Sequence, residues 1–147
     1  MNAVSELDST DKAEEIPLTQ VAALCHRKGK NGREVLLVTS SRGRWILPKG
    51  WPIDGLTDAE AAMQEAWEEA GVRKGAVTDK PVAKFKGRKR FSNGSERSAR
   101  VKVYGVKVLE TSRKYPERKR RDRRWVSLSK AAKLLDDNGF RKALKAL

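Results

Sequence analysis

Residues 50–72 read GWPIDGLTDAEAAMQEAWEEAGV, and the architecture expected for the whole chain follows from this segment. It holds no Lys or Arg, although the 147-residue chain contains 33 of them. It holds six acids, and among these Glu65, Glu68 and Glu69 are three and four positions apart. Side chains at that spacing project from one face of an α-helix. The segment therefore predicts a helix that presents three carboxylates together.

Local signals indicate where this helix begins and ends. Thr57 is followed three residues later by Glu60, the pattern of a capping box, in which each side chain binds the other residue's backbone N–H. Gly71 matches the glycine that commonly ends a helix with a positive φ. Together the two signals predict a helix over residues 57–70.

The carboxylate face of this helix has two interpretations. Like charges at helical spacing repel by roughly a few tenths of a kcal/mol per pair, so three acids without a cation beside them destabilise a helix unless a positive group binds among them. Oxygen ligands without His or Cys favour magnesium, calcium or manganese. A solvated, glutamate-rich helix surface has the same spacing, so the charge pattern alone leaves both interpretations open.

Hydrophobic patterns on either side of this segment predict a mixture of strands and helices. Apolar runs rich in β-branched residues predict strands, and the turn-forming sequence KGKNG joins the first two of them in a hairpin. The expected strands are residues 20–27, 34–40, 81–87, 99–110 and 123–128. A final helix is expected over residues 129–147, where apolar residues recur at helical spacing and Asn138-Gly139 is a candidate break.

Length and composition favour one domain without a membrane span. The chain is close to the common size of a single domain, which we expect at residues 16–147, after a disordered acidic tail of residues 1–15. No apolar run reaches the roughly 20 residues that cross a bilayer, and no basic and then apolar leader opens the chain. Because Cys25 is the single cysteine, no disulfide within the chain requires an oxidising compartment, and a cytoplasmic location is expected.

The chain is strongly basic, with a formal net charge of +14. A charge of that sign attracts polyanions, so nucleic acid, acidic membrane and polyphosphate are all candidate partners. The run RKRRDRR at residues 118–124 has three interpretations: a phosphate clamp, a contact with nucleic acid, or an exposed loop.

Taken as a whole, residues 50–72 resemble the Nudix signature. That signature consists of Gly, five residues, Glu, seven residues, Arg-Glu, an aliphatic residue, any residue, Glu-Glu, any residue, Gly and an aliphatic residue. Two positions differ from it, because Leu56 stands in place of the first Glu and Gln64 in place of Arg. Seven positions agree in register: Gly50, Glu65, Ala66, Glu68, Glu69, Gly71 and Val72.

The resemblance implies an α/β fold, a Nudix-type α/β/α sandwich with a mixed sheet and a loop-helix-loop catalytic element. It implies Mg²⁺ as the cofactor, with Mn²⁺ as a substitute. Glu68 and Glu69 would ligate the metal with the backbone carbonyl of Gly50, and Glu65 would ligate, orient or act as general base. A further acid from another loop is also implied, and the candidates are Glu96, Glu110 and Glu117.

Outside the signature, the chain is similar to the diphosphoinositol polyphosphate phosphohydrolase branch of that family. The similarity lies in the SSRGRWILP sequence before the signature, in the ERSAR sequence before a strand, and in the basic run that leads to Trp125. It implies a set of residues that bind substrate phosphates: Ser40, Ser41, Arg42, Arg97 and either Arg121 or Arg123. We add Lys49 to this set because a cation stands there beside Gly50.

The activity implied by the resemblance is magnesium-dependent hydrolysis of a phosphoanhydride bond in a polyanionic small molecule. Diphosphoinositol polyphosphates and dinucleoside polyphosphates are the expected substrates. The alternatives are an RNA 5′-pyrophosphohydrolase and a catalytically weak Nudix-fold module that binds RNA or polyphosphate. Nucleic acid therefore ranks second as a partner, no membrane contact is expected, and the sequence is compatible with a monomer or a homodimer.

Overall fold

A computed structural model describes residues 16–147, so the tail predicted for residues 1–15 lies outside the described part of the chain. The helices are α2 (Asp58–Ala70), α3 (Leu128–Leu134) and α4 (Asn138–Ala143), followed by the 3₁₀ turn η1 (Leu144–Ala146). The strands are β1 (Leu18–Gly29), β2 (Gly32–Thr39), β3 (Trp45–Ile46), β4 (Lys49–Gly50), β5 (Val72–Val77), β6 (Ala83–Arg90), β7 (Glu96–Thr111) and β8 (Arg123–Ser127).

The strands join in one mixed sheet, in which β3, β2, β1, β7 and β5 lie in that order. β4 pairs with β1, β6 with β7, and β8 with β2. The central pair, β1 and β7, is parallel, whereas the other pairs between these strands are antiparallel. β1 and β2 form the predicted hairpin, with Gly29 opposite Gly32 across the turn.

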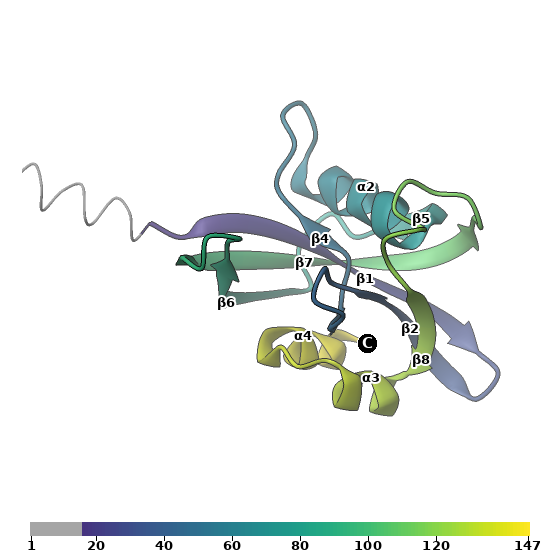
Figure 1. The fold of residues 1–147 in the computed structure, drawn as a ribbon. Coiled ribbons are helices and arrows are strands. Elements are labelled where there is room, and N and C mark those ends of the chain that lie inside the picture. Colours follow the sequence, from purple (N-terminus) through teal and green to yellow (C-terminus); the bar gives the residue numbers. More distant parts are fainter. Residues whose placement is uncertain (1–15) are drawn as a thin grey trace, which may run out of the picture.

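Helices cover both faces of this sheet (Figure 1). Val21 and Ala23 of β1 belong to the core beneath α2, whereas Ala22 and Leu24 belong to the core on the other face, with Phe140 of α4. This division follows from the strand pleat, which sends successive side chains to opposite faces. The predicted α/β/α sandwich with a mixed sheet is therefore confirmed.

α2 begins and ends as its local signals predict. The Thr57 hydroxyl accepts a hydrogen bond from the Glu60 N–H at 3.1 Å, and the Glu60 carboxylate accepts one from the Thr57 N–H at 2.8 Å. Gly71 ends the helix with a φ of 70°. Alanines form most of the buried side of α2, and these small side chains allow the helix to lie close to the sheet.

Three strands, β3, β4 and β5, occur where the sequence predicted no element. Residues 72–77 form β5 against the end of β7, in a segment whose register shifts and whose cations obscure the alternation typical of a strand. Lys49 and Gly50 form β4 in a segment rich in proline and glycine, because two residues suffice to pair with Val21 and Ala22 of β1. β3 likewise pairs with the end of β2, so all three strands are fixed by their partners and not by their own sequence.

The predicted C-terminal helix is divided into α3 and α4, and the break precedes the expected site at Asn138-Gly139. Leu135 is extended, and Asp137 caps α4. The Asp137 carboxylate accepts hydrogen bonds from the N–H groups of Gly139 at 2.7 Å and Phe140 at 3.2 Å, so the Asn-Gly pair opens a helix instead of interrupting one. In the described residues, the helices are too short or too polar to span a bilayer.

Replacing Gly71 by alanine should destabilise the fold for two reasons: the positive φ disfavours a side chain, and the added methyl group would collide with its neighbours. An added Cβ would lie 2.5 Å from the Tyr115 ring and 2.8 Å from the Ser112 carbonyl oxygen. Gly94 has a similar φ of 88°, but nothing lies within 4 Å of its Cβ position. We expect Gly94→Ala to lower the free energy of unfolding by about 1 kcal/mol and Gly71→Ala by roughly 2–4 kcal/mol in urea denaturation. Equal losses would contradict the close packing at the end of α2.

Candidate active site

The signature glutamates of α2 lie where the helix meets β4. Glu65 packs directly on Gly50, since a Cβ added at Gly50 would overlap the Glu65 carboxylate. A residue with a side chain at position 50 would displace that carboxylate, so this contact requires glycine. Pairing with Val21 of β1 holds Gly50 in place. The loop and the helix of the signature are thus joined at one point.

Glu69 is buried, with 3% of its surface exposed. Burial is the main reason that the pKa of its carboxyl is raised to about 8, and Arg121 opposes this rise while the hydrogen bond with Glu65 adds to it. Burial also raises the pKa of Glu65, whereas accepting the hydrogen bond from Glu69 lowers it. Burial thus favours the protonated form in this pair, and the rise in pKa is larger for Glu69. The backbone N–H of Lys49 also donates to Glu69, at 3.3 Å.

Arg121 reaches these acids from the loop between β7 and β8. Its guanidinium lies 3.7 Å from Oε2 of Glu69 and donates to Glu117 and to the Thr39 carbonyl, both at 2.8 Å. The same loop is anchored to α2, because the Glu117 N–H donates to the Glu68 carbonyl at 2.9 Å. Arg121 thus connects the loop, the end of β2 and the buried carboxylate.

Among the three candidates for a further acidic ligand, the structure brings Glu117 to the site. Glu117 contributes to the raised pKa of Glu65, which places its charge nearby. Glu96 pairs with Arg88, and Glu110 lies beside two cations of β5, Arg73 and Lys74. Glu96 and Glu110 are therefore paired with cations near the two ends of β7.

The chemistry of this acidic group suits a hard divalent cation. Its side chains supply only oxygen donors, and the raised pKa of Glu69 indicates that Arg121 neutralises its charge incompletely. Within residues 16–147, no three His, Cys, Asp or Glu side chains converge as a complete metal site. Glu68 is turned aside, since its carboxylate accepts from the Gln64 amide at 2.8 Å. Glu65 and Glu69 thus offer carboxylate oxygens of the type that a hard cation prefers, whereas the Glu68 carboxylate is engaged by Gln64.

The predicted Ser-Ser-Arg loop is a tight turn after β2. The Ser40 hydroxyl accepts from the N–H groups of Arg42 at 3.3 Å and Arg44 at 3.2 Å, and Gly43 completes the turn with a φ of 78°. Ser40 therefore shapes the loop, while Ser41, Arg42 and Arg44 line the adjoining space.

Two clefts adjoin this loop. The inner cleft, of about 150 Å³, is lined by Gln20, Ser40, Ser41, Ile46, Lys49, Gly50, Trp51, Glu69, Lys89 and Arg121. The outer cleft, of about 280 Å³, is lined by Ser40, Ser41, Arg42, Arg44, Trp45, Ile46, Lys49, Arg88, Lys89, Arg90, Asp136, Asp137 and Phe140. The clefts are contiguous because they share Ser40, Ser41, Ile46, Lys49 and Lys89. One extended ligand can thus reach from Glu69 to the cations of the outer cleft.

Two of the residues expected to bind phosphate do not line these clefts. Arg97 donates to the Ile16 carbonyl at 2.7 Å. Arg123 donates to the Ala70 carbonyl at 2.8 Å and lies over the Tyr115 ring, 4.7 Å from its centre. In this arrangement Arg123 supports the end of α2.

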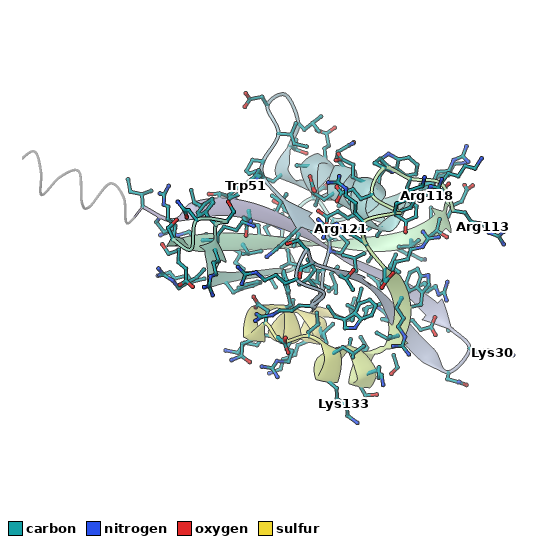
Figure 2. All side chains as sticks on the ribbon, in the orientation of Figure 1. Lys30, Trp51, Arg113, Arg118, Arg121 and Lys133 are labelled. Carbon is teal, nitrogen blue, oxygen red and sulfur yellow. The ribbon has the colours of Figure 1, made fainter. Side chains whose placement is uncertain are left out.

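The basic run of residues 118–124 divides between the site and the surface. Arg121 lies near the middle of the molecule, whereas Arg118 lies toward the outer edge of the loop, on the same side as Arg113 (Figure 2). Arg118, Lys119 and Arg120 are exposed. Arg121 of this run therefore lines the inner cleft, whereas residues 118–120 lie on an exposed loop.

Several cleft residues were not among those predicted. Gln20 is 4% exposed and lines the inner cleft, and Lys89 lines both clefts. A signal for Lys89 was available, because the alternation along β6 places it on the half-buried side of the strand with Phe85. Asp136 and Asp137 line the outer cleft from the segment between α3 and α4. The sequence did not predict where the C-terminal helix divides, so it did not indicate these two residues.

Comparison with known proteins identifies relatives of this chain. A model of the NUDIX domain family matches residues 18–147. "Nudix hydrolase 12, mitochondrial" of Arabidopsis thaliana is 35% identical over 119 residues, which cover 78% of this chain and 58% of that protein. "Diphosphoinositol polyphosphate phosphohydrolase 3-beta" of Bos taurus is 34% identical over 120 residues, which cover 79% of this chain and 68% of that protein. The chain thus spans little more than half the length of the plant relative.

The fold is also shared with solved structures. The crystal structure of C. elegans Ap4A hydrolase aligns with a TM-score of 0.63 and 19% sequence identity, covering 89% of this chain and 96% of that one. At this identity the likeness concerns the fold alone.

The variant Glu69→Gln should be more stable than the wild type at pH 8 and gain less at pH 5. The raised pKa of about 8 means that the folded protein holds a proton that the unfolded chain, with a pKa near 4.5, releases. Glu69 therefore contributes its full stability below pH 4.5 and loses it as the pH rises to 8. Glutamine does not titrate. We expect a gain of at least about 1 kcal/mol at pH 8, measured by urea unfolding with a chelator present.

Asp54→Asn is the matched control, because it removes the same charge from an exposed residue of the loop before α2. It should change the free energy of unfolding by less than about 0.5 kcal/mol at both pH values. If Glu69→Gln gained equally at pH 5 and pH 8, burial of the charge would not be the cause.

Proposed function

Because this chain belongs to the NUDIX domain family, we propose that it is a magnesium-dependent hydrolase that cleaves a phosphoanhydride bond in a small, highly anionic substrate. The proposed substrates are diphosphoinositol polyphosphates or dinucleoside polyphosphates. One observation carries the proposal: the inner cleft, with its buried acid Glu69, opens into an outer cleft lined by cations. A diphosphate at the acidic end and further phosphates at the basic end would occupy both.

The glutamates of α2 have the metal-binding role in this proposal. Glu65, Glu68 and Glu69 would hold Mg²⁺ or Mn²⁺ with the Gly50 carbonyl, and the ion would neutralise charge on the phosphoryl oxygens. Burial of Glu69 strengthens its attraction for a cation, since charges interact more strongly away from water. Glu65, whose pKa is raised by burial, is suited to accept a proton from the attacking water.

Cations around the clefts have the substrate-binding role. Lys49 lines both clefts, and its pKa is lowered first by burial and then by the charge of Lys89, so an anionic phosphate beside it would relieve both effects. Ser41 and Arg42 lie on the turn after β2, where an arginine fork suits phosphate oxygens. Because the buried Cys25 forms no disulfide, a cytoplasmic location fits the proposal.

Hydrolysis of a substrate panel with and without magnesium tests the function. The panel contains an inositol pyrophosphate, diadenosine polyphosphates, nucleoside triphosphates and RNA with a 5′ triphosphate. We expect magnesium-dependent release of product from one of the first two classes, and we expect Glu69→Gln to lower kcat by at least about 100-fold because a metal ligand is lost. Asp54→Asn should retain full activity.

Two outcomes would contradict this assignment. Full activity in folded Glu69→Gln would exclude Glu69 from the metal site. Failure of the wild type to cleave any panel member, combined with tight binding of one, would favour a binding module. Binding of RNA that weakens steeply with salt would identify the anionic partner as nucleic acid.

Arg42→Ala should raise KM by about tenfold and change kcat less, since the exposed guanidinium binds substrate phosphate without touching the reacting atoms. Lys30→Ala is the control. It removes an equal charge at the tip of the β1–β2 hairpin, which Figure 2 shows apart from Trp51 and Arg121 of the inner cleft. Equal effects of the two variants on KM would mean that net charge, and not the turn after β2, attracts the substrate.

A further inference from the structure

Lys89 is a half-buried lysine without an acidic partner in the described residues. It lies on the cleft side of β6, and none of the ion pairs formed within residues 16–147 includes it. Directly opposite on β7 is Arg97, so two cations face each other across the strand pair. Like charges in this position destabilise a sheet.

Arg97 increases this cost. One guanidinium nitrogen, Nη2, donates to the Ile16 carbonyl, but Nε is buried and has no hydrogen-bond partner in the described structure. A buried donor without a partner is unfavourable. Within the described residues, the positive charge opposite Lys89 therefore has a backbone carbonyl as a partner but no carboxylate.

Lys49 brings a second lysine to the same side of the sheet. β4 pairs Lys49 with Ala22, whose side chain belongs to the core beneath α4, and the Lys49 ammonium lies 5.7 Å from the centre of the Phe140 ring. Asp137 and Glu69 attract this ammonium, but Asp137 is already engaged as the cap of α4. Two lysines from two strands thus line the junction of the clefts without a carboxylate dedicated to them.

The balance of charge around the junction favours an anion. The outer cleft has two acids, Asp136 and Asp137, and it has six cations, of which Arg88 alone pairs with an acid within the described residues. The cations are Arg42, Arg44, Lys49, Arg88, Lys89 and Arg90. A group with several negative oxygens would satisfy both lysines of the junction, whereas a neutral sugar or base would leave their repulsion in place.

We propose that Lys89 and Lys49 form an anion subsite at the junction of the two clefts, which binds a phosphate group of the substrate other than the one attacked. The assignment of this anion to a substrate rests on the proposed function, whereas the capacity to bind a phosphate does not. Lys89 is then a specificity-determining residue. Substrates with further phosphate groups beyond the cleaved diphosphate gain a contact that a molecule with an isolated diphosphate lacks.

Calorimetric titration with myo-inositol hexakisphosphate, in the presence of a chelator, tests the subsite. This probe carries phosphates but no anhydride bond. Lys89→Met should weaken its binding by about tenfold or more, the value of one charge-assisted contact. Lys86→Met is a closely matched control, since Lys86 is exposed on the other side of β6 and also faces an arginine, Arg100. It should change the affinity by less than about twofold.

Equal losses in the two variants would overturn the proposal, because they would mean that the probe responds to net charge. Absence of binding to the wild type would overturn it as well. Lys89→Glu distinguishes binding from folding. It replaces repulsion of Arg97 by a cross-strand ion pair, so it should raise the thermal midpoint while it abolishes binding. A lowered midpoint together with lost binding would assign Lys89 a structural role and contradict the subsite.

The same variants separate this proposal from the proposed function. Selective loss of hexakisphosphate binding in Lys89→Met supports the subsite whether or not any substrate is cleaved. Failure of the wild type to hydrolyse the panel with magnesium contradicts only the proposed function.

Discussion

A carboxylate buried at the junction of a helix and a sheet is the constraint on which the rest of the site depends. Glu69 is almost fully inaccessible, and an ion in such a place is unfavourable unless its charge is compensated. Two groups supply that compensation, the backbone N–H of Lys49 and the guanidinium of Arg121, whereas Glu65 opposes it and favours the protonated form of Glu69. The charge also acts beneath the helix, since burial first and Glu69 second raise the pKa of the Cys25 thiol to about 12.

The separation of charge along the chain becomes a separation in space. α2 and its flanking loops carry the acids, and the cations gather on the turn after β2, on β6 and on the loop between β7 and β8. Each group is unfavourable by itself, because like charges repel along a helix and across a strand pair. Their proximity makes a cleft with opposite charges at its two ends, and under the proposed function this arrangement would orient an extended polyanion bearing a metal ion.

Structural duties and binding duties are divided among residues of the same type. Arg121, Arg123 and Arg97 are all arginines near the expected site, yet only Arg121 lines a cleft. Arg123 holds the end of α2, and Arg97 holds the start of β1. The serines differ in a similar way: both line the two clefts, but the Ser40 hydroxyl is engaged by backbone N–H groups of the turn. Residue type and neighbourhood in the sequence could not distinguish these roles.

The sequence by itself determined the elements whose signals are local. The capping box at Thr57 and Glu60, the glycine after α2, the β1–β2 hairpin and the shared face of the glutamates were predictable, because each depends on residues a few positions apart. Only the tertiary structure decided the strands β3, β4 and β5, the position of the break before α4, and the approach of Arg121, Glu117 and Lys89 to the carboxylates and clefts. These features arise from pairing and burial between segments far apart in the chain, and the free energy of such contacts has no local signature.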